Sequence, residues 1–92
     1  MKLVRLSSGE EIVGNVEHLD DSINIKNGYS LIPTGEGKIG FMKFMAYTKA
    51  HDGVEINNRF IVFIVDPVDA LVAQVREMDS GIVVPESSGI II

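Results

Sequence analysis

The chain has 92 residues, 46% of them hydrophobic and 23% charged, a composition typical of one globular domain. It contains no cysteine, which excludes disulfide bonds and thiolate metal sites, and its formal net charge of −5 argues against a strongly basic nucleic-acid-binding surface. The longest apolar run, 60–65, is far shorter than the roughly 18 residues of a membrane span, and the start of the chain is charged. We therefore expect a soluble, cytoplasmic protein.

The charge is unevenly distributed along the chain. Residues 1–25 carry two basic and five acidic side chains, and residues 66–92 carry one basic and five acidic. Residues 26–65 carry five basic against three acidic side chains, so the middle of the chain is mildly basic. A local basic face is therefore compatible with the negative total.

Short β-strands are predicted at the start of the chain. The β-type runs 3–6 and 11–18 are separated by a Ser-Ser-Gly-Glu turn. Gly14 lies inside the second run, where a glycine usually marks a sharp bend or a close backbone approach. Residues 22–26 alternate polar and apolar side chains, as a half-buried strand does.

Further turns and strands follow. The Asn-Gly pair at 27–28 predicts a turn, and the next run, 29–32, is expected to stop at Pro33, which cannot donate to a strand ladder. After a glycine-rich turn at 34–37, residues 38–47 read as a long strand with apolar side chains on both faces.

A loop is expected at 48–53, a short strand at 54–56 and a turn at the two asparagines that follow. Residues 59–65 are nearly continuously apolar and read as the last strand. Strands that are apolar on both faces must be covered on both. Either a second copy of the chain, or its own helix and tail, would supply that cover.

One amphipathic helix is predicted at about 67–80. Asp66 is a suitable N-cap, Pro67 suits the first helical position, and Gly81 can end the helix. Apolar side chains recur along one helical face at Val68, Leu71, Val72, Val75 and Met78. The remainder, 82–92, reads as an irregular apolar tail.

Residues 6–25 resemble the first sequence motif of the Sm and Sm-like proteins. The matching positions are Gly9, Ile12, Gly14, Val16, Leu19, Asp20, Ile23 and Asn24. The layout is also similar to that of small Sm-like proteins of marine phages, which carry their helix at the C-terminus. The resemblance implies a mainly β fold: an SH3-like small open barrel of five bent antiparallel strands with one C-terminal α-helix, over residues 1–81.

The resemblance further implies a ring of roughly five to seven subunits, in which the fourth strand of one copy pairs with the fifth strand of the next. Either 38–47 or 54–56 takes the place of the fourth strand. Such rings bind single-stranded nucleic acid around a central pore, with RNA favoured over DNA. A phage-encoded protein of this kind would act in the cytoplasm of the host cell.

The family's binding residues carry over by position. Asn24 stands where an amide reads a base edge, and Ser22 stands at the stacking position, although a serine has no π-face. Arg59 is the nearest match to the arginine of the second motif, where this chain has Asn-Asn-Arg in place of Arg-Gly. Asn57 and Asn58 could add amide contacts. The alternatives are that Asn24 has a purely structural role and that Arg59 is a solvated charge at the strand edge that contacts no ligand.

Other chemistry is not indicated. His18 and His51 lack companion ligands for a metal, and the two aspartates at 20–21 read as a turn pair. No nucleophile context or cofactor motif is present, so we expect neither an enzyme nor a cofactor. The rival function is a phage structural or adaptor ring that binds protein and no nucleic acid. The net charge, Ser22 and the missing Arg-Gly favour that rival.

Overall fold

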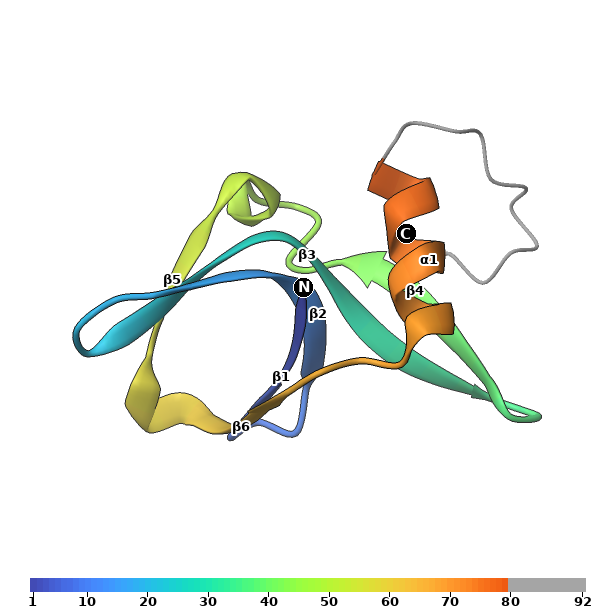
Figure 1. Ribbon diagram of the computed structural model, residues 1–92, viewed down its shortest axis with the longest axis horizontal. Helices are drawn as coiled ribbons and strands as arrows, with labels where there is room; N and C mark the ends of the chain where they lie inside the picture. Colours follow the sequence, from blue (N-terminus) through green and yellow to red (C-terminus); the bar gives the residue numbers. More distant parts are fainter. Residues whose placement is uncertain (80–92) are drawn as a thin grey trace.

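The computed structural model describes residues 1–79, so the tail predicted at 82–92 lies outside the described residues. The described chain is mainly β, with one α-helix near its C-terminal end, as the sequence predicts (Figure 1). It has six strands, not the five expected. The elements in chain order are β1 (Lys2–Leu6), β2 (Glu11–His18), β3 (Ser22–Gly35), β4 (Lys38–Lys43), the 3₁₀ helix η1 (Ala50–Asp52), β5 (Val54–Asn57), the 3₁₀ helix η2 (Asn58–Phe60), β6 (Ile61–Val65) and α1 (Asp69–Asp79).

The six strands form one antiparallel sheet in the order β4-β3-β2-β1-β6, with β5 also paired to β3. The first half of β3 pairs with β5, and its second half pairs with β4. In Figure 1 the strands β1, β2, β5, β6 and the first half of β3 curl around a common interior. The hairpin of β3 and β4 extends away from that interior toward α1.

The turn predicted at 27–28 is wrong, because β3 runs through it as one bent strand of 14 residues. Asn27 takes a left-handed backbone conformation with φ of 55°, a region that asparagine tolerates better than most residues. At Gly28 an added Cβ would lie 3.2 Å from side-chain carbons of both Ile12 and Ile25. The Asn-Gly pair therefore bends the strand over a tightly packed interior without ending it.

Pro33 does not end β3 either, since it pairs with Ile39 of β4. Beyond Ser30, β3 has β4 as its strand partner and no longer pairs with β2. A proline without an N–H donor is tolerated at such a sheet edge.

The strand predicted at 38–47 ends at Lys43, four residues early. The backbone N–H of Phe44 donates to the Gly28 carbonyl at 2.9 Å, and the Phe44 ring is buried in the interior of the curled sheet. Met45 then has a positive φ of 48°, which turns the chain away from the sheet. Burial of Phe44 decides where the strand stops.

Two apolar clusters lie on opposite faces of the sheet. The inner cluster fills the curled part, and its buried members are Val4, Ile12, Ile23, Ile25, Phe44 and Ala50. The outer cluster lies between the sheet and α1, and its buried members are Val13, Tyr29, Phe41 and Val75. The helix therefore covers the second apolar face of β4, and Phe41 needs no second copy of the chain to be buried.

The helix begins at Asp69 and not at Pro67. Asp66 does not cap it; its carboxylate instead forms an ion pair with Lys2, which lowers the pKa of Asp66. Leu71, Val75 and Met78 pack in the outer cluster as predicted, but Val68 precedes the helix and is exposed. The end expected at Gly81 lies outside the described residues. No helix within residues 1–79 is long and apolar enough to cross a membrane.

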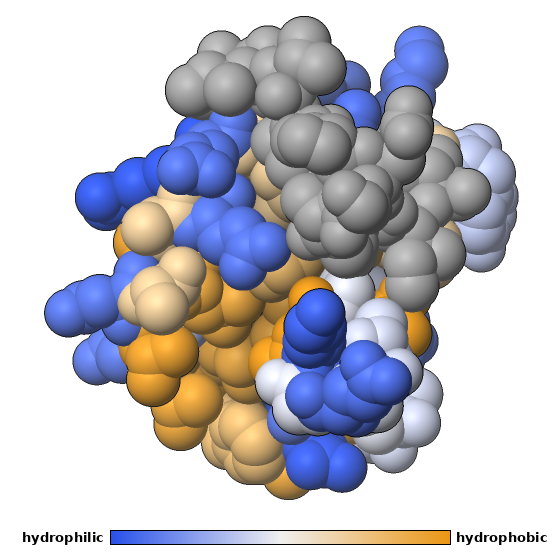
Figure 2. Space-filling model, turned by 90° about the vertical axis from the view of Figure 1, so that its right-hand side faces the viewer, coloured by the Kyte–Doolittle hydropathy of each residue, from blue (hydrophilic) through white to orange (hydrophobic). Residues whose placement is uncertain are grey.

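Some apolar surface stays open to solvent. On the face shown in Figure 2, apolar side chains gather in one continuous area bordered by hydrophilic ones. The described residues with large exposed apolar side chains are Leu19, Ile39, Tyr47, Phe60, Val62, Phe63, Val65 and Val68. Three of them belong to β6, so the apolar side chains of this strand are largely open to solvent.

Candidate nucleic-acid interface

The five residues that the sequence singles out for nucleic-acid binding lie along β3, β5 and η2. Ser22 faces Asn57 across the β3–β5 pair, and Asn24 faces Glu55 two residues further along. Asn58 and Arg59 follow directly in η2. The fold therefore gathers four of the residues at one end of this strand pair, with Asn24 one step behind them.

Four of these five residues already make hydrogen bonds within the chain, through a side chain or through the backbone. The Ser22 hydroxyl is buried and donates to Oε2 of Glu55 at 2.7 Å. Asn57 Oδ1 accepts from the backbone N–H of Arg59 at 3.0 Å and so caps η2. The backbone N–H of Asn58 donates to the Asp21 carbonyl at 3.0 Å. Ser22 and Asn57 are thus engaged within the chain.

Arg59 is exposed and lies beside an aromatic ring. Its guanidinium carbon is 5.8 Å from the centroid of Phe60, within the range of a cation–π contact. Half of Phe60 is also solvent-exposed. The pair presents a positive charge and a π-face together at the start of β6.

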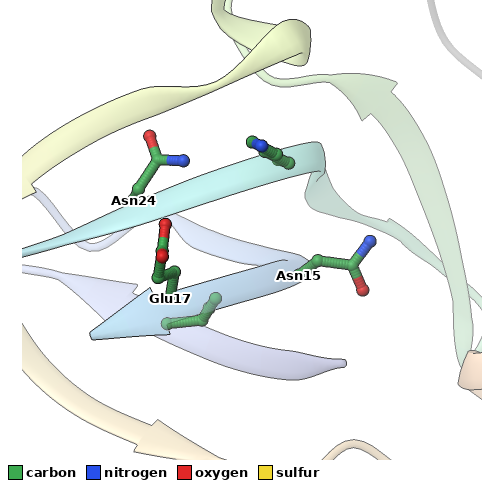
Figure 3. A pocket seen from close by; sticks show the side chains of 5 residues that line it. Asn15, Glu17 and Asn24 are labelled. Atoms are coloured by element: carbon green, nitrogen blue, oxygen red, sulfur yellow. The ribbon is translucent and has the colours of Figure 1, made fainter. Parts of the chain in front are cut away.

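Asn24 has a different setting from the other four residues. It lines an open hollow of about 330 Å³ on the outer side of β2 and β3. Figure 3 shows its side chain together with those of Asn15 and Glu17, which line the same hollow. The residues that line the hollow are Asn15, Val16, Glu17, Asn24 and Lys26. Within residues 1–79 the Asn24 side chain has no hydrogen-bond partner, so its amide is free to donate and accept.

Charges of both signs surround this amide. Asn24 faces Glu17 of β2 on one side and Glu55 of β5 on the other, while Lys26 follows two residues along β3. Carboxylates accept hydrogen bonds from base amino groups but repel phosphate, whereas a lysine attracts phosphate. The hollow can therefore bind a base edge at Asn24, with a phosphate near Lys26.

The start of β5 approaches the same residues closely. A Cβ added to Gly53 would lie 3.4 Å from Oδ1 of Asn24 and 3.7 Å from Cγ of Lys26. Gly53 also has a φ of 146°, a conformation that favours glycine. The loop before β5 is thus held against the Asn24 hollow.

Sequence reasoning missed Asn15, Glu17 and Glu55 as neighbours of Asn24. The alternation of 22–26 indicates that Lys26 shares a face with Asn24. No sequence signal identifies the residues opposite on β2 and β5, because they follow from strand register.

His51 and the buried Tyr29 have structural settings. His51 Nδ1 lies 3.3 Å from the Gly28 carbonyl, and its ring meets Tyr29 edge-on at 5.1 Å. The Tyr29 hydroxyl donates to Oδ1 of Asp79 at 3.0 Å and so ties α1 to the sheet. Burial, together with this carboxylate, raises the pKa of Tyr29 to about 12. Residues 1–79 contain no group of three or more side chains suited to hold a metal ion.

No protein-family model matches the chain, and no curated protein matches it.

Proposed function

We propose that the chain is a subunit of a closed, Sm-like homo-oligomeric ring that binds single-stranded nucleic acid, with RNA favoured over DNA. The observation that carries the proposal is the uncharged, exposed outer edge of β6. The free Asn24 amide beside Lys26 supports the nucleic-acid part of it.

The strand arrangement supports the Sm-like barrel. Five strands curl together in the order β5-β3-β2-β1-β6, and the 3₁₀ helix η2 joins β5 to the last strand. In this reading β5 takes the place of the family's fourth strand. The β4 strand is then an addition that, with the second half of β3, supports α1.

The two ends of the sheet differ in charge, which supports assembly through β6. The end strand β4 begins at Lys38 and ends at Lys43, and these charges discourage edge pairing. The other end strand, β6, has the sequence Ile-Val-Phe-Ile-Val with no charge or proline. Such an edge promotes aggregation unless it is covered. Among residues 1–79, β5 pairs only with β3, so a second copy offers the free edge of its β5 to β6.

Replacing Val62 with lysine is expected to disrupt the ring. Val62 lies in the middle of β6 and is 60% exposed, so a lysine fits the free chain but would place a charge in the proposed contact. Native mass spectrometry at low micromolar protein is expected to give a closed oligomer for the wild type and monomers for Val62→Lys.

Val68→Lys is the matched control, because Val68 is 72% exposed and lies outside the strand. It should leave the oligomer intact. A monomeric wild type, or an unchanged oligomer in Val62→Lys, would contradict assembly through β6.

Replacing Asn24 with alanine is expected to weaken single-stranded RNA binding by roughly 2- to 10-fold, since each amide hydrogen bond is worth about 0.5–1.5 kcal/mol. Fluorescence anisotropy with labelled oligouridylate measures the change, and Thr34→Ala on the β3–β4 hairpin serves as the control. Wild-type affinity should also fall steeply between low and moderate salt, because phosphate contacts release counterions. Equal affinity of Asn24→Ala and wild type would count against the role of Asn24.

The second candidate is a protein-binding ring without nucleic acid. It is favoured by the carboxylates around the site, Glu17 and Glu55 beside Asn24 and the pair Asp20 and Asp21 in the preceding turn. These charges repel phosphate. A stable ring that takes up no oligonucleotide at low salt would favour this candidate.

A further inference from the structure

The loop between β4 and β5 presents an aromatic side chain to solvent. Tyr47 is 88% exposed, the largest exposure among the large apolar or aromatic side chains of residues 1–79. The chain has no tryptophan, and its other tyrosine, Tyr29, is buried. An isolated exposed tyrosine is common on protein surfaces, so the surroundings of Tyr47 decide whether it indicates a binding site.

The loop is built as a compact unit. Thr48 donates to the Met45 carbonyl twice, from its backbone N–H at 2.8 Å and from its hydroxyl at 2.7 Å. The Thr48 hydroxyl also accepts from the backbone N–H of Ala50 at 3.0 Å. Tyr47 therefore lies in a hydrogen-bonded turn that holds its backbone.

Both ends of this turn are fixed to the same point of β3. The Gly28 carbonyl accepts from the Phe44 backbone N–H at 2.9 Å and lies 3.3 Å from His51 Nδ1. Phe44 and Ala50 are buried in the inner cluster. Phe44 and Ala50, three residues before and after Tyr47, thus point into the protein, while Tyr47 itself is exposed.

Two lysines lie in this loop or at its start. Residues 43–53 contain Lys43 and Lys49 against one acidic side chain, Asp52. The loop ends at Gly53, whose backbone lies against Asn24 and Lys26. Along the chain, Tyr47 and Lys49 therefore precede Gly53, whose backbone approaches the free Asn24 amide and Lys26.

From this arrangement we infer that Tyr47 stacks on a base of bound single-stranded nucleic acid, whose backbone runs along the lysines toward Asn24. Base stacking on aromatic side chains, combined with a basic groove, is the general mode of single-strand binding. Ser22, at the position where the family resemblance places the stacking residue, is buried and has no π-face. Tyr47 supplies the missing ring from a different loop. The inference rests on the proposed nucleic-acid binding.

The test measures oligouridylate binding by anisotropy and by tyrosine fluorescence. With no tryptophan present, stacking on Tyr47 is expected to quench the intrinsic emission of the wild type as oligonucleotide is added. Tyr47→Ala should bind roughly 5- to 150-fold more weakly, the range that stacking of one base gives. Tyr47→Phe keeps the ring and should bind within about twofold of wild type. Ile39→Ala removes another exposed apolar side chain and serves as the control.

The outcomes separate this inference from the function on which it rests. Wild-type binding with unchanged affinity in Tyr47→Ala would overturn the stacking role and leave nucleic-acid binding in place. No binding by the wild type at low salt would overturn both. Equal weakening in Tyr47→Ala and Tyr47→Phe would overturn the stacking role as well, because the ring would then not be the recognised group. Native mass spectra of the variants check that the oligomeric state is unchanged.

Discussion

Phe41→Ala is expected to destabilise the protein by about 3–5 kcal/mol, the usual cost of removing a buried phenylalanine. Phe41 is 1% exposed and lies in the outer cluster with Val13, Tyr29 and Val75, between the sheet and α1. A domain of this size has a total stability of about 5–15 kcal/mol, so the loss is a large fraction of it. Urea unfolding followed by circular dichroism measures the change.

Ile39→Ala is the matched control, since it lies on the same strand two residues earlier and is 47% exposed. Ile39→Ala should lower the free energy of unfolding by less than about 1 kcal/mol, as most surface substitutions do. Similar costs for the two variants would show that α1 does not cover β4 as described.

Gly14→Ala is expected to destabilise the protein by about 1–3 kcal/mol or more through overpacking. A Cβ at Gly14 would lie 2.9 Å from Cγ2 of Ile25, 3.0 Å from the Lys26 carbonyl oxygen and 3.1 Å from Cα of Gly28. Two of these three atoms belong to the backbone of β3, so no side-chain rotation relieves the contact. The strand pair would have to separate at its bend.

The change in unfolding free energy of Gly14→Ala is to be compared with that of Asn15→Ala, at the neighbouring exposed position. Only the glycine variant should be strongly affected, and its thermal unfolding midpoint should fall as well. Wild-type stability in Gly14→Ala would mean that β2 and β3 do not approach as closely as described.

Gly14 illustrates what a local pattern can predict. A glycine inside a β-branched run indicated a bend, and in the fold it lies at the register shift between Val13 and Asn15. The bounds predicted for β2 are the observed ones. Its β-branched run and the turns before and after it all lie within a few residues of the strand, so the local sequence is enough to place it. The helix was predicted from its apolar period, although its start was placed two residues early.

The wrong predictions have a common cause. Local turn rules predict a break at the Asn-Gly pair 27–28 and at Pro33, and the length of an apolar run predicts the end of β4. In the fold each is decided by a distant contact: Gly28 by the side chains of β2, Pro33 by the absence of β2 beside it, and Phe44 by the inner cluster. The turn or strand preference of a short segment is a weak guide to its structure where burial against distant residues opposes it.

In the candidate site, too, local sequence patterns and contacts between distant segments decide different things. Local sequence patterns predict the first two strands, the start of the third and the amphipathic helix, and they offer Ser22, Asn24 and residues 57–59 as polar candidates. Contacts between distant segments determine which of these residues are engaged and which are free. The Ser22 hydroxyl bonds Glu55, Asn57 caps η2, and the Asn24 amide has no partner within residues 1–79. The tertiary structure also brings Gly53, at the end of the Tyr47 loop, against Asn24. The physical reason is that periodicity and turn chemistry act within a few residues, whereas hydrogen-bond partners and burial depend on strand register between segments tens of residues apart.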